Sequence, residues 1–208
     1  GGMLHYGIPS YRLPRRWLDL EINLLKKLGI EFKLNTPLGQ ELTVDHLFRQ
    51  GYSAVFLAVG AHRGTFPGVP GEDLAGVLLG VDFLSRVNSG EAVPVGSRVA
   101  VIGGGNTAMD CARTALRLGA EEVYIVYRRS EGEITALPEE IAAAREEGIK
   151  FMMLTSPVRF IGKGGRLVQM ECVKNRLEDK KDGSRPHPVP IAGSEFTLDV
   201  DMIILAIG

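Results

Sequence analysis

Cysteine is nearly absent from this chain of 208 residues. Cys111 and Cys172 are its only two cysteines, and neither belongs to a C-x-x-C motif or to a regular series of cysteines. They therefore indicate neither a disulfide framework nor a zinc site. The four histidines are scattered without the spacing of metal ligands. We expect no metal centre and a reducing, cytoplasmic setting.

An excess of charge of one sign is missing too. Lys plus Arg number 24 and Asp plus Glu number 25, which leaves a net charge of -1 and argues against a general nucleic-acid binder. No apolar run reaches the length of a membrane span. The 45% hydrophobic and 24% charged residues fit a globular protein. We expect neither a nucleic acid nor a membrane as partner.

Strand and helix patterns alternate in the second half of the chain. Apolar, strand-like segments at residues 98–102, 123–127 and 150–154 enclose helical patterns at 106–118 and 138–147. This order predicts an α/β fold, a Rossmann-like doubly wound parallel sheet. A hairpin follows over residues 158–175, then a polar loop at 178–193 and a strand at 196–198. Residues 202–207 are apolar enough to return to the sheet as a central strand.

The first half is less regular. We predict helices at residues 14–28 and 81–87, a short helix N-capped by Thr43, and strands at 30–34 and 54–59. The stretch at 90–97 contains Pro94 and Gly96 and is a plausible domain boundary. We therefore divide the chain into residues 1–93 and 94–208. The buried type of the last strand and a first residue other than Met favour a part of a larger protein.

One glycine-rich motif carries chemistry. It lies between the strand at 98–102 and the helix that follows, and it fits G-x-G-x-x-A; its residues are Gly103, Gly104, Gly105, Asn106, Thr107 and Ala108. Gly103 permits the tight turn, Gly105 lets a pyrophosphate approach the backbone, and Ala108 lets the helix pack closely on the strand. The amides near Asn106 and Thr107 and the helix dipole favour a phosphate. The alternative is a glycine turn that binds nothing.

The end of the next strand indicates which dinucleotide binds. NAD sites usually place Asp or Glu there, whereas this sequence has Arg128 and Arg129. Two guanidinium groups could hold the 2′-phosphate of NADP by charge-assisted hydrogen bonds, unless they are simply solvated. Cys111 is expected in the core, and Glu139, Glu140, Glu146 and Glu147 on a solvated helix face. We find no catalytic acid or base, which favours hydride transfer to a second cofactor.

Several segments together resemble the glutamate synthase small (beta) subunit family and related FAD-dependent NADPH oxidoreductases. Residues 1–14 resemble the family's GG-L-x-x-GIP-x-x-RLP stretch, and residues 58–61 and 205–208 resemble its two strand ends beside the cofactors. Residues 101–108, 127–130 and 134–140 resemble its NADPH-binding half. The resemblance covers nearly the whole chain.

The resemblance implies the fold of flavoprotein reductases with two dinucleotide-binding domains, and NADPH and FAD as cofactors. It places Gly7, Ile8, Pro9, Ala206 and Gly208 near them. The family's N-terminal FAD phosphate loop and its iron–sulfur cysteines have no counterpart here. We therefore expect an NADPH domain with a β-hairpin insertion, joined to part of an FAD domain that holds FAD poorly and is inactive alone.

In the intact protein, NADPH would reduce FAD, and electrons would pass through iron–sulfur centres to a large glutamate synthase-type or other electron-accepting subunit. Two other interpretations stay open. One is a free-standing NADP-dependent dehydrogenase, which would need a catalytic group beside the nicotinamide. The other is a non-catalytic nucleotide-binding interaction module.

Overall fold

A five-stranded parallel sheet forms the centre of the molecule. The structure is a computed structural model that describes residues 2–39, 42–179 and 185–207. The strands are β1 (Val77–Leu79), β2 (Arg98–Ile102), β3 (Glu122–Val126), β4 (Lys150–Met152) and β9 (Met202–Leu205), and their order is β1-β9-β2-β3-β4. Every residue of β9 is buried, between β1 and β2. The prediction of a returning interior strand is therefore confirmed.

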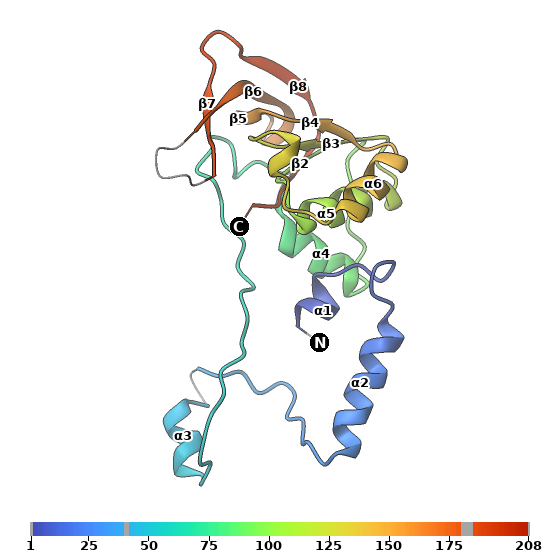
Figure 1. Cartoon of the computed structure of the whole chain (residues 1–208), viewed down its shortest axis with the longest axis vertical. Helices are drawn as coiled ribbons and strands as arrows, with labels where there is room; N and C mark the ends of the chain where they lie inside the picture. Colours follow the sequence, from blue (N-terminus) through green and yellow to red (C-terminus); the bar gives the residue numbers. More distant parts are fainter. Residues whose placement is uncertain (1, 40–41, 180–184, 208) are drawn as a thin grey trace.

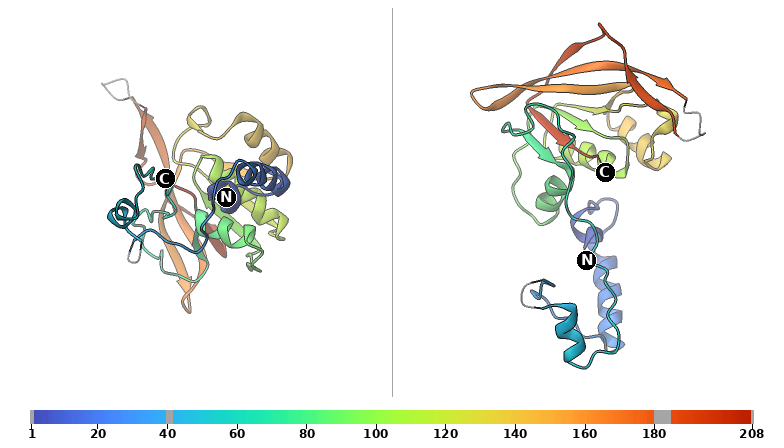
Figure 2. Two further views of the ribbon diagram at one scale, coloured as in Figure 1. Left: turned by 90° about the horizontal axis from the view of Figure 1, so that it is seen from below. Right: turned by 90° about the vertical axis from the view of Figure 1, so that its left-hand side faces the viewer.

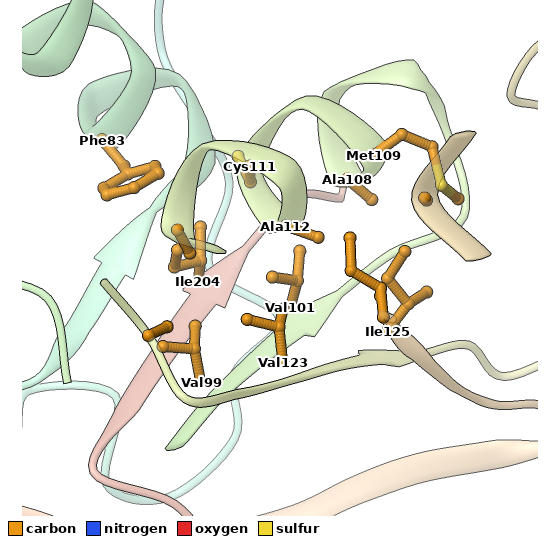
Figure 3. Close-up of a cluster of buried hydrophobic side chains, with 14 of the residues drawn as sticks. Phe83, Val99, Val101, Ala108, Met109, Cys111, Ala112, Val123, Ile125 and Ile204 are labelled. Carbon is orange, nitrogen blue, oxygen red and sulfur yellow. The ribbon is translucent and has the colours of Figure 1, made fainter. Parts of the chain in front are cut away.

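Three helices cover one face of this sheet (Figure 1). They are α4 (Gly80–Asn88), α5 (Asn106–Arg117) and α6 (Pro138–Glu146), and α6 has Pro138 at its first turn, as the sequence predicts. Figure 3 shows Ala108, Cys111 and Ala112 of α5 facing the sheet. All three are fully buried, so the small side chains let the helix lie close to β2 and β9. Cys111 is a core residue, as expected.

An antiparallel sheet covers the opposite face, where a doubly wound fold could have carried further helices. It consists of β5 (Thr155–Lys163), β6 (Arg166–Glu178), β7 (His187–Pro190) and β8 (Phe196–Asp199). β5 and β6 form the predicted hairpin, turning at Gly164 and Gly165, which both have positive φ. Its buried side chains, among them Phe160 and Met170, pack on Ala100 and Val126 of the central sheet. Figure 2 shows this layer opposite the helices.

Two features of the layered region were not predicted from the sequence. Residues 178–193 are not simply a loop, because His187–Pro190 forms β7 and pairs with Asn175–Glu178 of β6; residues 180–184 lie outside the described part of the chain. Strand β1 has only three residues and becomes a strand by pairing with β9. β1 and α4 precede the predicted boundary at residue 93 and yet pack on this sheet. The boundary itself stays a prediction.

The first part of the chain contains α1 (Met3–Tyr6), which packs on α4, and α2 (Arg15–Lys27) and α3 (Val44–Arg49), which extend away from these layers (Figures 1 and 2). The Thr43 side chain caps α3 as predicted. The strands predicted at 30–34 and 54–59 are wrong, because neither segment pairs with another described strand. An isolated strand leaves its backbone groups to water and its apolar face uncovered. Accordingly, Phe56 is 92% exposed. None of the described helices is long and apolar enough to cross a membrane.

Candidate nucleotide-binding site

The glycine loop leaves the C-terminal end of β2 and turns directly into α5. Gly103 has a φ of 149°, and a Cβ there would lie 2.3 Å from the Ala206 carbonyl oxygen. Its N–H donates to the Val126 carbonyl at 3.1 Å, and the Ala206 N–H donates to the Ile102 carbonyl at 2.8 Å. Only glycine fits this passage between the ends of β3 and β9. Gly208 lies outside the described residues.

Gly104 and Gly105 are small for different reasons. A Cβ on Gly104 would lie 2.6 Å from the Tyr127 ring, so this glycine makes room for a side chain of the protein itself. A Cβ on Gly105 would meet only the Thr135 hydroxyl, at 3.6 Å, and Gly105 has ordinary extended backbone angles. The fold therefore tolerates a side chain at 105, and the open space there is available to a ligand that approaches the backbone.

Helix α5 starts without a side-chain cap. Gly105 is its N-cap residue, and the N–H groups of Asn106 and Thr107 donate to no described residue. A helix of 12 residues carries a partial positive charge at this end, and its free amides are donors for an anion. Ala108 is fully buried against the sheet. These residues thus form a phosphate-binding arrangement of the kind that the motif predicts.

Residues 135–137 hold the glycine loop through hydrogen bonds. Gly104 accepts hydrogen bonds from the N–H groups of Thr135 (3.0 Å) and Ala136 (3.2 Å), and the Asn106 side chain accepts one from the Leu137 N–H at 2.9 Å. The Asn106 side chain therefore positions residues 135–137. Sequence reasoning missed this role; the polar side chain at the start of a helix was the only signal.

Arg128 and Arg129 follow β3, and the structure separates their roles. The Arg128 side chain is exposed, with no hydrogen bond or ion pair to the described residues, although its carbonyl accepts a hydrogen bond from Asn175 at 3.0 Å. The Arg129 Nε donates to the Pro186 carbonyl at 3.0 Å. Arg128 thus has its full donor set available for a ligand, whereas Arg129 is partly engaged.

A cavity of about 170 Å³ joins the N-terminal segment to the start of α5. Gly7 and Ile8 line it together with Asn106, Thr107 and Asp110, and Pro9 is buried next to them. Residues separated by about 100 positions in the sequence therefore face one space. The cavity thus brings Gly7 and Ile8, two of the three N-terminal candidate residues, beside the phosphate loop. Ala206 lies behind Gly103.

An ion-pair network borders this cavity. Arg12 contacts the Asp110 carboxylate at 2.7 Å and that of Glu140 at 2.8 Å, and Arg113 pairs with Glu140 and Glu147. The expectation that Glu140 and Glu147 lie on a solvated helix face is wrong, because Glu140 of α6 and Glu147 just after it both pair with arginines of α5. A charged pair, Asp110 and Arg113, within a run of small apolar residues was the signal available in the sequence.

Burial changes the acidity of Asp110. Desolvation raises its pKa to about 6, against the opposing attraction of Arg12, and its Oδ1 has no hydrogen-bond partner among the described residues. Hydrogen bonds from Arg117 and Arg113 instead lower the pKa of Glu147 to about 2.

In the described chain, no group of three His, Cys, Asp or Glu residues is placed to hold a metal ion.

Residues 19–208 match the family model described as pyridine nucleotide-disulphide oxidoreductase. The chain belongs to this family. Its relatives include the NADP(+)-dependent formate dehydrogenase subunit beta of Moorella thermoacetica, which is 46% identical over the whole chain. The glutamate synthase [NADPH] small chain of Halomonas elongata is 37% identical over the whole chain. The resemblance to glutamate synthase small subunits and related reductases is thereby confirmed.

This member of the family spans only 30% of the Moorella protein and 46% of the Halomonas protein. Its whole length also superposes on 61% of a solved structure, Mycobacterium tuberculosis FprA in complex with NADPH, with a TM-score of 0.79 and 22% identity. That likeness concerns the fold. It confirms the predicted class, an α/β fold of the flavoprotein reductase type with an antiparallel insertion.

Proposed function

We propose that the protein binds NADPH and is the NADPH-binding portion of an FAD-dependent oxidoreductase of the glutamate synthase small-subunit type. The observation that carries this proposal is the start of α5, where the Asn106 and Thr107 amides have no partner among the described residues and a Cβ on Gly105 would meet only the Thr135 hydroxyl. The pyrophosphate would lie over residues 103–108, as in other dinucleotide-binding folds. The 2′-phosphate would lie at Arg128, which favours NADPH over NADH.

The nicotinamide end would then point toward the cavity at Gly7, Ile8 and Pro9. This direction agrees with the resemblance of residues 1–14 to a segment near the flavin. The domain division proposed above follows from it, with residues 94–208 mainly responsible for NADPH and residues 1–93 contributing to the flavin side. Ala206 and Gly208 belong to the strand end that adjoins the cofactors in this proposal.

The described residues fit NADPH better than FAD. The sequence has one G-x-G-x-x-A loop, and α5 uses it, whereas a second dinucleotide needs a second phosphate site. Residues 54–59 have no partner strand in the described chain, and Phe56 and Val59 are 92% and 66% exposed. We therefore propose that this chain alone holds FAD poorly and is inactive without it.

In the intact protein, FAD would take a hydride from NADPH and release electrons singly. The two relatives are named as subunits and take their names from different reactions. We therefore assign the partner only as an electron-accepting subunit with iron–sulfur centres, of which a large glutamate synthase-type subunit is one example. We further propose a cytoplasmic location.

Replacing Gly105 by Val tests the proposal. A Val side chain would fill the space over the helix N-terminus, so we expect NADPH binding to fall at least a hundredfold in calorimetric titrations. The melting temperature without nucleotide should stay nearly unchanged, because a Cβ at this position meets only the Thr135 hydroxyl at 3.6 Å. Gly105→Ala should weaken binding less. Unchanged NADPH binding by the Val variant would show that the loop is only a structural turn.

A further inference from the structure

Arg185 reaches the end of β3 from a distant part of the sequence. It lies just before β7, and its Nη2 donates to the Tyr127 hydroxyl at 3.0 Å and to the Glu133 carbonyl. The neighbouring residue, Pro186, accepts the hydrogen bond from Arg129. The antiparallel insertion therefore brings one more guanidinium group to the turn that carries Arg128 and Arg129.

The unpaired arginines of the layered region are concentrated at this turn. Ion pairs with described carboxylates engage Arg86, Arg98, Arg113, Arg117, Arg145, Arg159 and Arg176. From β1 onward, the arginines without such a partner in the described chain are Arg128, Arg129, Arg166 and Arg185. Three of these four flank one turn. An uncompensated cluster of this kind attracts a group with several negative charges.

The Glu133 carboxylate belongs to the same turn as the cluster. Glu133 accepts hydrogen bonds from the N–H and the hydroxyl of Ser130, at 3.1 and 2.5 Å, within a capping box. Arg185 contacts the backbone carbonyl of this residue, and no ion pair joins their side chains. Glu133 therefore organises the turn, and the guanidinium groups keep their charge for a ligand.

We propose that Arg185 is a further specificity-determining residue, which binds the 2′-phosphate of NADPH together with Arg128. This inference rests on the proposed NADPH function and adds the antiparallel insertion to the binding site. A 2′-phosphate has three acceptor oxygens and close to two negative charges, enough for two arginine side chains. The Tyr127 hydroxyl and the Glu133 carbonyl hold Arg185 beside the turn, which reduces the entropy lost on binding.

A purely structural role is the competing explanation. Arg185 could act only as a clamp on Tyr127, whose ring lies against Gly104 of the phosphate loop. A clamp would support every nucleotide equally, whereas a phosphate ligand would discriminate. Adenosine 2′,5′-bisphosphate and AMP differ only in the 2′-phosphate, and they are therefore suitable probes.

The experiment measures the affinity of both probes for the protein and for Arg185→Ala by calorimetry. We expect the bisphosphate to bind about tenfold more weakly to the variant, the loss typical of one charge-assisted hydrogen bond. AMP should bind unchanged. Arg185→Lys, which keeps the charge, should recover part of the loss and steepen the salt dependence. Arg159→Ala removes an arginine of β5 that pairs with Glu171 at 2.6 Å, and it is the matched control.

The outcomes separate this inference from the proposal on which it rests. If the unchanged protein binds neither probe nor NADPH, the proposed function fails. If it prefers the bisphosphate, and Arg128→Ala abolishes that preference while Arg185→Ala leaves it intact, the role of Arg185 is refuted and the NADPH function stands. An equal loss for bisphosphate and AMP would establish the clamp and overturn the inference.

Discussion

Single residues in this site differ in whether other groups of the protein already fill the space beside them or bond to them. Gly103 and Gly104 make room for the protein itself, namely the Ala206 carbonyl and the Tyr127 ring, whereas Gly105 leaves room for something else. The two arginines after β3 differ in the same way, because Arg129 is bonded to the Pro186 carbonyl and the Arg128 side chain has no partner in the described part of the chain. Sequence position alone treats the members of each group as equivalent.

This difference predicts unequal effects of the two arginines on cofactor choice. Arg128→Ala should weaken NADPH binding by roughly tenfold or more, since a charge-assisted bond is worth about 1.5–3 kcal/mol, less where solvent screens it. Arg129→Ala should weaken it less. NADH, which has no 2′-phosphate, should change little in either variant. Titration of each variant with both nucleotides checks this, and equal losses for NADPH and NADH would contradict it.

At the scale of elements, helices α5 and α6 are joined by charge as well as by apolar contact. Glu147, just after α6, accepts hydrogen bonds from Arg113 and Arg117 of α5, at distances of 2.8–3.1 Å. Arg12 links the N-terminal segment to both helices through Asp110 and Glu140. The cavity beside the phosphate loop thus has a wall fixed by ion pairs.

Stability should depend on Glu147 and on pH in a defined direction. Its pKa is about 2 in the folded protein and ordinarily 4.5, so the stabilisation is complete above pH 4.5 and is lost as the pH falls toward 2. Glu147→Gln should lower the free energy of unfolding at pH 7 by about 1 kcal/mol, because solvent screens part of the interaction. Urea unfolding at several pH values measures this.

The neighbouring Glu146 provides the matched control for that measurement. It is exposed, and none of its contacts in the described chain is an ion pair. Glu146→Gln should therefore leave stability within about 0.5 kcal/mol of the unchanged protein, as is usual for surface substitutions. A stability difference between Glu147→Gln and the unchanged protein that stayed undiminished from pH 7 to pH 2 would contradict the assignment to an ion pair.

At the scale of the whole molecule, the burial of apolar side chains is distributed unevenly. The central sheet is buried on both faces, by α4–α6 and by the antiparallel sheet. The first 70 residues instead leave many large apolar side chains exposed, including Trp17 at 52% and Leu28 at 71%. Such side chains are normally covered in a folded protein, so this part of the chain buries far less apolar surface than the layered part.

Hydrogen exchange should report this division. We expect the amides of β9 and β2 to exchange most slowly, because they lie inside the sheet under two layers. Amides of residues 53–68 should exchange at rates near those of an unfolded chain, since this segment forms no strand or helix. Mass spectrometry of peptides after timed labelling measures both, and strong protection of residues 54–59 would contradict the prediction.

The sequence by itself determined the elements whose signals are local. The glycine motif, the alternation of strands and helices, the hairpin and the apolar last strand all follow from periodicity and turn residues within short windows. The resemblance of scattered segments also predicted the family, because those segments keep their order along the chain. These features include the phosphate loop at residues 103–108 and the arginines that follow β3.

Only the tertiary structure decided what distant segments do together. Whether an apolar run becomes a strand depends on a partner, so β1 forms on β9 while residues 54–59 find no partner strand among the residues that the structure describes. Contacts between distant segments also make Glu140 and Glu147, expected on the surface, ion-pair partners of α5. They likewise place Arg185 at the end of β3. Pairing and burial of charge are contacts across the fold, and their energies are not encoded in any one stretch of sequence.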